Sequence, residues 1–159
     1  MIKKEKIVGI LGGMGPYATV YFFKQIVDST PAKKDREHLH VLIDNNVKIP
    51  SRTRAILYNE ISPVRLMIKS INKLALWGAD FVVVPCNSAH FFYEQVIKAI
   101  KIPWLNMIKI VSQALKKSQK KQPLILGGYI TIKKKLYSKY IPHAIYLPQT
   151  ENQHIFTFI

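Results

Sequence analysis

Cysteine is almost absent from this 159-residue chain, which contains one, Cys86. A single thiol excludes an internal disulfide, and so low a cysteine content is typical of a protein of the reducing cytoplasm. Long apolar runs are also missing, because none approaches the ~20 residues that a membrane-spanning helix needs. The charged residues 1–6 do not fit a secretory signal peptide. The sequence therefore predicts a cytoplasmic protein without a membrane partner.

Acidic residues are few, and none occurs between Glu94 and Glu151. The chain has 24 lysines and arginines against 9 aspartates and glutamates, which gives a formal net charge of +15. An excess of this size suggests nucleic-acid binding as one alternative. Most of the basic residues are lysines, however, and no helix-turn-helix, zinc-finger or RNP pattern accompanies them. We therefore expect a solvated basic face and no specific nucleic-acid partner.

Hydrophobic residues make up 48% of the chain and charged residues 21%, which excludes disorder as its main state. Short apolar runs alternate with segments of helical periodicity. Strands are predicted at residues 6–11, 39–43, 81–84, 124–126 and 144–147, with a short strand at 104–105. Helices are predicted at residues 16–29, 63–77, 88–100, 107–117 and 131–140. This alternation predicts an α/β fold with a parallel sheet and flanking helices.

Two similar α/β halves are predicted, with a boundary near Pro103. Residues 1–103 form an N-terminal half that carries Cys86, and residues 104–159 form a second half with a weaker pattern. The last residues, 154–159, are apolar and follow closely on the last predicted strand. We therefore expect the second half to be incomplete.

The first candidate site is the glycine-rich turn at residues 12–19, which follows the first predicted strand. Glycines at a strand end allow a ligand to approach the backbone, and the next helix offers free N–H groups to an anion. Gly13, Gly15 and Ala18 match the loose dinucleotide fingerprint. Asp44 lies further along the chain than the usual ribose-binding acid. A turn without a ligand and a NAD site therefore fit this segment equally well.

The second candidate site is the turn from Pro85 to His90, at the carboxyl end of a predicted strand, where open α/β sheets bind ligands. Cys86 precedes a predicted helix whose N-terminus favours a thiolate over a thiol, with Ser88 as the expected N-cap. Asn87 and Ser88 can donate hydrogen bonds to a carboxylate, whereas His90 falls inside the helix and is less suited to act as a base. Lone cysteines are usually inert core residues, but this position favours a functional one.

The third candidate site is the polar loop at residues 44–51, which is followed by Arg52 and Thr53. Arginine in such a loop is suited to hold a carboxylate through two parallel hydrogen bonds. On these residues alone, a solvated loop is the better interpretation.

Together these segments resemble the aspartate/glutamate racemase family, and more specifically its cofactor-independent aspartate racemase branch. The matching motifs are Gly12 to Pro16, Asn45 and Asn46 followed by Ile49 to Thr53, and Pro85 to His90, with smaller matches at Thr30 to Ala32 and at Glu37 and His38. The resemblance covers about residues 7–145. Ser88 stands where the family more often has threonine, which keeps the hydroxyl.

The resemblance implies an isomerase that uses no pyridoxal phosphate, no other cofactor and no metal. In this family one cysteine thiolate removes the α-proton of an acidic amino acid, and a second cysteine returns a proton from the opposite face. Carried over to this sequence, Cys86 is one of the two bases and Arg52 holds the side-chain carboxylate. Asn87 and Ser88 hold the α-carboxylate, where fixed donors stabilise the developing negative charge. The remaining pocket residues are expected to be Met14, Asn45 and Thr131.

The family's second cysteine lies in a Gly-Cys-Thr-Glu block, which this chain does not contain. We therefore expect a C-terminally truncated racemase with impaired two-base activity, in which Cys86 removes and returns a proton on one face. The resemblance also implies a homodimer that binds aspartate or glutamate. Three alternatives remain open: a non-catalytic remnant that binds an acidic amino acid, a dinucleotide-binding domain, and a basic nucleic-acid binder.

Overall fold

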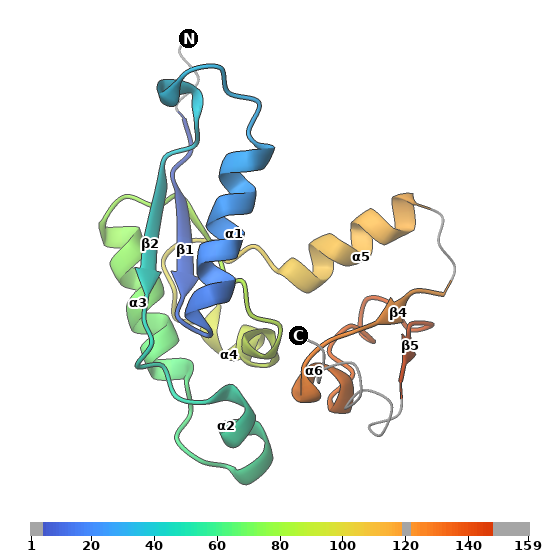
Figure 1. Cartoon of the computed structure of the whole chain (residues 1–159). Helices are drawn as coiled ribbons and strands as arrows, with labels where there is room; N and C mark the ends of the chain where they lie inside the picture. Colours follow the sequence, from blue (N-terminus) through green and yellow to red (C-terminus); the bar gives the residue numbers. More distant parts are fainter. Residues whose placement is uncertain (1–4, 119–121, 148–159) are drawn as a thin grey trace. The chain divides into compact units, whose positions relative to one another are not determined.

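The computed structural model describes residues 5–118 and 122–147 (Figure 1). Their contacts divide the chain into two compact units, Met1–Leu105 and Asn106–Ile159, and each unit is described by itself. Strands alternate with helices in both, which confirms the predicted α/β fold. Within the described residues, no helix has the length and apolar character needed to cross a membrane.

The first unit is built on a parallel sheet with the strand order β2-β1-β3. Its strands are β1 (Val8–Gly12), β2 (Val41–Asn45) and β3 (Phe81–Val83). Every residue of β1 is buried, as expected for the central strand of a parallel sheet. Gly12 pairs with Asn45, so β1 and β2 end at the same level. Val82 also forms a parallel bridge with Trp104, where the short strand was predicted.

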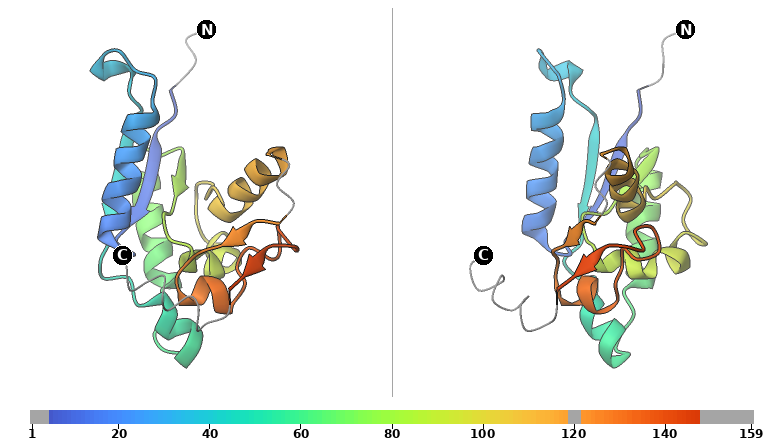
Figure 2. Two further views of the ribbon diagram at one scale, coloured as in Figure 1. Left: turned by 45° about the vertical axis from the view of Figure 1, so that its right-hand side comes forward. Right: turned by 90° about the vertical axis from the view of Figure 1, so that its right-hand side faces the viewer.

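Helices α1 (Pro16–Ser29) and α3 (Val64–Leu76) cover opposite faces of this sheet (Figure 2). Two glycines of β1 explain how both helices come close. A Cβ on Gly9 would lie 3.5 Å from a side chain of α3, whereas a Cβ on Gly12 would lie 2.3 Å from Thr19 of α1. Residues three apart in a strand face opposite sides. The missing side chains therefore make room for one helix on each face.

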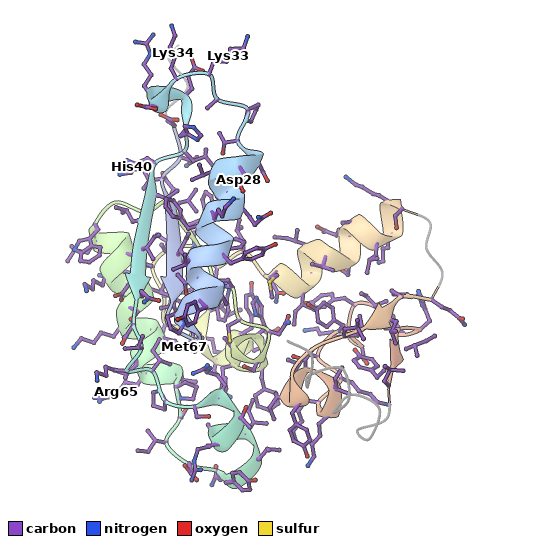
Figure 3. All side chains as sticks on the ribbon, in the orientation of Figure 1. Asp28, Lys33, Lys34, His40, Arg65 and Met67 are labelled. Carbon is purple, nitrogen blue, oxygen red and sulfur yellow. The ribbon has the colours of Figure 1, made fainter. Side chains whose placement is uncertain are left out.

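Short helices complete the first unit. They are η1 (Asp35–Glu37), α2 (Arg52–Tyr58), η2 (Ser88–Phe92) and α4 (Tyr93–Val96). Figure 3 shows Lys33, Lys34 and His40 around η1, at the amino end of the sheet. Met67 of α3 lies towards the other end in the same view and is fully buried. The candidate site residues of the first unit follow the carboxyl ends of its strands.

The helix predicted at residues 88–100 is wrong in type and length. The structure has a 3₁₀ segment, η2, followed by the single α-turn α4. The backbone N–H of His90 donates to the Asn87 carbonyl at 3.0 Å, which is the i to i+3 spacing of a 3₁₀ helix. The aromatic residues that follow are weaker α-helix formers than alanine or leucine. Ser88 is consequently the first residue of η2 and not an N-cap.

Helix α2 was not predicted, although its start has a recognisable signal. The Ser51 side chain accepts a hydrogen bond from the Arg54 N–H at 3.3 Å, which is a typical N-cap contact. The polar character of the preceding loop hid this signal in the sequence. As a result Arg52 begins a helix and does not lie in a free loop.

The second unit pairs two short parallel strands and packs them with helices. Its elements are α5 (Met107–Lys117), β4 (Leu124–Ile125), α6 (Tyr129–Lys133) and β5 (Ile145–Tyr146). Helix α5 has the bounds that were predicted. The helix predicted at residues 131–140 is wrong in extent, since α6 ends at Lys133. Lys135 adopts a φ of 46°, which a right-handed helix cannot accommodate.

Candidate functional site

All three candidate segments of the first unit lie at the carboxyl edge of its sheet. Strand β1 leads into the glycine-rich turn, β2 into the loop before α2, and β3 into the turn that carries Cys86. The side chains of Met14, Ile49 and Cys86 belong to one buried hydrophobic cluster. Segments far apart in the sequence therefore meet at the edge where open α/β sheets bind ligands.

The glycine-rich turn depends on a left-handed residue and on one buried hydroxyl. Gly13 has a φ of 85°, and a Cβ there would lie 2.4 Å from the carbonyl carbon of Asn46. Thr19 accepts a hydrogen bond from the Gly13 N–H at 3.0 Å and donates one to the Gly15 carbonyl at 3.1 Å. Thr19 is the last residue of the candidate segment 12–19, but its role in the turn was not predicted. The available signal was a threonine in the first turn of α1, directly after the glycines, where its hydroxyl can reach their backbone.

We expect the Thr19→Val variant to be less stable than wild type by about 1–3 kcal/mol, because the partly buried Gly13 N–H would lose its acceptor. Valine keeps the shape of the side chain, so the change reports on the hydroxyl. Urea unfolding followed by circular dichroism measures it. Thr19→Ser retains the hydroxyl and should lose clearly less stability. A valine variant as stable as wild type would contradict this role of Thr19.

Arg52 connects the second loop to the glycine-rich turn. Its guanidinium donates to the Pro50 carbonyl at 3.1 Å and to the Met14 carbonyl at 3.0 Å. Its Nε is buried and has no hydrogen-bond partner among the described residues. A guanidinium has five N–H donors, so donors remain for an anion after both carbonyl contacts. The side chain is thus held in place before any ligand binds.

The two neighbouring asparagines of this loop have different environments. Asn45 ends β2 and is exposed. Asn46 is tied to the protein, since its side-chain amide donates to the Ser70 hydroxyl of α3 at 2.9 Å and its side-chain oxygen accepts from the Lys48 N–H at 3.1 Å. Asn45 is therefore the one whose side chain is open to solvent, and Asn46 supports the loop.

Cys86 is a buried thiol with a polar neighbour. Its side chain belongs to the hydrophobic cluster and is 9% exposed. The Sγ atom lies 3.4 Å from the Ser88 hydroxyl oxygen, and either atom can be the donor. Asn87, between them, is half-buried. The thiol, the hydroxyl and the amide that were predicted to act together therefore lie on consecutive residues of one tight turn.

Thr131 lies apart from these residues in the sequence and belongs to the second unit. It is buried in α6, and a Cβ on Gly127 would lie 2.9 Å from its Cγ2. The same close contact of a glycine with a threonine occurs in the first unit between Gly12 and Thr19. The structure therefore groups Met14, Asn45, Arg52, Cys86, Asn87 and Ser88 in one unit and places Thr131 in the other.

His90 faces the protein interior and not solvent. Its side chain is 7% exposed, and its ring lies 5.0 Å from the ring of Trp104 between centroids. Burial lowers the pKa of His90 below its usual range, and a hydrogen bond to the Cys86 carbonyl offsets part of that effect. His90 is therefore neutral at neutral pH.

The free energy of unfolding should fall as the pH drops below about 6.5, the ordinary pKa of a histidine. The pKa of His90 is lowered by folding, so the unfolded chain binds more protons in this range. The stabilisation by neutral His90 is complete above that pH and is lost as the pH falls towards the folded-state pKa. Urea unfolding between pH 5 and 7.5 measures it, and His90→Asn should show a shallower dependence. Equal slopes for both proteins would contradict this assignment.

The described residues contain no group of three or more histidine, cysteine, aspartate or glutamate side chains that could hold a metal ion.

Comparison of the sequence with known proteins finds a family and a curated relative. A family model described as Asp/Glu/Hydantoin racemase matches residues 11–157. The chain is 30% identical over 137 residues to the broad specificity amino-acid racemase RacX of Bacillus subtilis (strain 168). That match covers 84% of this chain and 59% of RacX, so the chain spans about three fifths of that relative's length.

Comparison of the fold finds solved structures of the same kind. The aspartate racemase of Picrophilus torridus superimposes with a TM-score of 0.88 at 32% identity, over 96% of this chain and 67% of that one. An aspartate racemase homologue from Pyrococcus horikoshii OT3 gives a TM-score of 0.80 at 19% identity, over 98% of this chain and 70% of that one. At that identity the second match reports the shared fold alone.

Proposed function

Since the chain belongs to the Asp/Glu/Hydantoin racemase family, we propose that it moves the α-proton of an acidic amino acid, aspartate or glutamate, without pyridoxal phosphate. The observation that carries the proposal is the position of Cys86. Its thiol follows parallel strand β3 by three residues, lies 3.4 Å from a hydroxyl, and shares a cluster with the glycine-rich turn. A thiolate there would meet a ligand bound at the carboxyl edge of the sheet.

In the proposed reaction Cys86, as a thiolate, takes the α-proton, and the electron pair of the broken C–H bond moves onto the α-carboxylate. Donors that hold this carboxylate lower the barrier, because they stabilise the charge that develops there. Asn87 and Ser88 are assigned to that role, and their position next to the thiol supports it. Arg52 is assigned to the side-chain carboxylate, which its remaining N–H donors support. Met14 and Asn45, at the same edge of the sheet, are assigned as further residues of this pocket, and Thr131 of the second unit is assigned to substrate binding as well.

Inversion requires a second acid on the opposite face of the α-carbon. The 159 residues contain one cysteine, so within this sequence a second thiol is not the source. With Cys86 alone, the proton that is removed and the proton that returns use the same face. We therefore propose that the basal reaction is exchange of the α-hydrogen with solvent. Racemisation is impaired unless another acid is supplied.

Two rival functions are less well supported. A dinucleotide site would use Asp44 for the ribose, but its carboxylate lies 3.7 Å from the Lys73 ammonium of α3. The Gly13 N–H, which a phosphate would require, is hydrogen-bonded to Thr19. A non-catalytic protein that binds an acidic amino acid would use the same residues as the proposed enzyme. Only an activity measurement distinguishes that rival from the proposal.

We also propose that the protein forms homodimers and acts in the cytoplasm. The dimer is supported by apolar side chains exposed on α1, where Tyr17 is 90% exposed and Val20 and Tyr21 about two thirds. The low cysteine content supports the compartment. Residues 104–159 are assigned as a partial counterpart of the first half, which the repeated glycine–threonine contact supports.

Proton NMR of the protein with L-aspartate in D₂O tests the proposed reaction, with L-glutamate in a parallel sample. Loss of the α-hydrogen signal without formation of D-aspartate supports a single base. Loss of the signal with D-aspartate in a chiral assay supports a racemase with a second acid. No loss from a folded sample overturns the proposed activity. Calorimetry with L-aspartate then shows whether the same residues form a binding site.

A further inference from the structure

The ring of His90 is hydrogen-bonded to the backbone of the residue that carries the thiol. Its Nδ1 lies 2.9 Å from the Cys86 carbonyl oxygen. A carbonyl oxygen only accepts hydrogen bonds, so Nδ1 carries the proton. The backbone N–H of His90 also donates to the Asn87 carbonyl at 3.0 Å. One residue therefore holds two consecutive carbonyls of the turn.

Trp104 contacts residues on both sides of the Cys86–Ser88 turn, namely Val82 before it and His90 and Tyr93 after it. Its backbone bridges Val82 of β3, the strand that leads into the turn. Its ring packs against His90 at 5.0 Å and against Tyr93 at 4.9 Å between centroids. The Tyr93 hydroxyl donates to the Trp104 carbonyl at 3.2 Å. The His90 ring therefore packs on a tryptophan that is itself held by Tyr93 and by β3.

We propose that His90 is a positioning residue, whose Nδ1–H fixes the Cys86–Ser88 turn and so presents the thiol, the amide and the hydroxyl in one geometry. The ring acts through the Cys86 backbone, so it is not assigned as a catalytic residue. The effect of His90 on the reaction rests on the proposed function. Its effect on the position of the Cys86 thiol does not depend on that function.

Two substitutions of equal shape separate positioning from packing. In asparagine the Nδ2 atom is the same number of bonds from Cα as Nδ1 in histidine, so His90→Asn can donate to the Cys86 carbonyl. In leucine a methyl group takes that place, so His90→Leu cannot. Both replacements leave the same space where the rest of the ring packed against Trp104. A difference between them therefore reports on the hydrogen bond.

The first readout is the rate at which iodoacetamide alkylates Cys86 in the folded protein, which needs no substrate because Cys86 is the single thiol. We expect His90→Asn to keep the wild-type rate within about threefold and His90→Leu to change it by on the order of 10-fold or more, since misplacing a reacting group by 1 Å has effects of that size. In the α-hydrogen exchange assay the leucine variant should lose kcat more than it raises KM. Equal alkylation rates for all three folded proteins would overturn the proposal.

A second measurement needs no variant. In ¹⁵N-labelled wild-type protein, the ring nitrogen shifts of His90 should report the neutral tautomer with the proton on Nδ1. A neutral tautomer protonated on Nε2 would overturn the proposal even if the leucine variant failed to fold. If none of the proteins exchanges the α-hydrogen but the alkylation rates differ as expected, the proposed function fails and the positioning role stands.

Discussion

Replacement of Cys86 with alanine is expected to abolish exchange of the α-hydrogen of L-aspartate, or to lower its rate by at least 10²- to 10⁴-fold, the range that a general base contributes. In the first unit the thiol is the candidate base at the carboxyl edge, and the lysines shown around η1 lie at the other end. Proton NMR in D₂O measures the rate directly. The reaction requires a group that accepts a proton from carbon, and alanine supplies none.

The Cys86→Ser variant is the matched control for the fold. Serine is close to cysteine in size and can keep the contact with Ser88, but its hydroxyl is a far weaker acid than a thiol. We expect the serine variant to fold as wild type does and to lose exchange as the alanine variant does. Retention of exchange by either folded variant would mean that the base lies elsewhere, and the assignment of Cys86 would be withdrawn.

Replacement of Gly13 with alanine is expected to cost roughly 2–5 kcal/mol of stability. About 1–2 kcal/mol comes from placing a Cβ in the left-handed region, at a φ of 85°. A further 1–3 kcal/mol or so comes from overpacking, because the Cβ would lie 2.4 Å from the Asn46 carbonyl carbon. The clash is with backbone, which cannot move away as a flexible side chain would. Urea unfolding followed by circular dichroism measures the loss.

The same turn offers its own control at Gly15. That residue has a φ of −104°, which alanine adopts freely, and a Cβ there would meet no atom within 4 Å. Gly15 is the N-cap of α1, where alanine is less favourable than glycine, so Gly15→Ala should cost about 1 kcal/mol or less. If both alanine variants lost the same stability, the argument from the conformation of Gly13 would be wrong.

The elements with the clearest patterns were predicted correctly from the sequence. The apolar runs gave β1, β2 and β3, and helical periodicity gave α1, α3 and α5. Alternation of strands and helices was enough to predict a parallel sheet, and a parallel sheet places the loops that follow its strands at one edge. The gathering of the glycine-rich turn, the Arg52 loop and Cys86 follows from that topology.

Two of the remaining differences involve single hydrogen bonds, which periodicity does not report. The cap by Ser51 starts α2, and the contact of His90 with the Cys86 carbonyl accompanies a 3₁₀ segment where a long helix was expected. Arg52 was expected to hold a ligand carboxylate, but its contacts with Pro50 and Met14 depend on the path of two loops. Such a path is settled by packing and could not be deduced from residue spacing.

The strand order of the first unit has a consequence for its folding during synthesis. Central strand β1 is made first, but its neighbour β3 follows about 70 residues later, which at 5–20 residues per second is a delay of roughly 4–14 s. Over that interval one edge of an apolar strand is unpaired and can template association with other nascent chains. Strand β1 is paired along both edges only when β3 joins the sheet, and Cys86 follows β3 by three residues. The proposed catalytic turn is therefore assembled in the same late step that covers the second edge of β1.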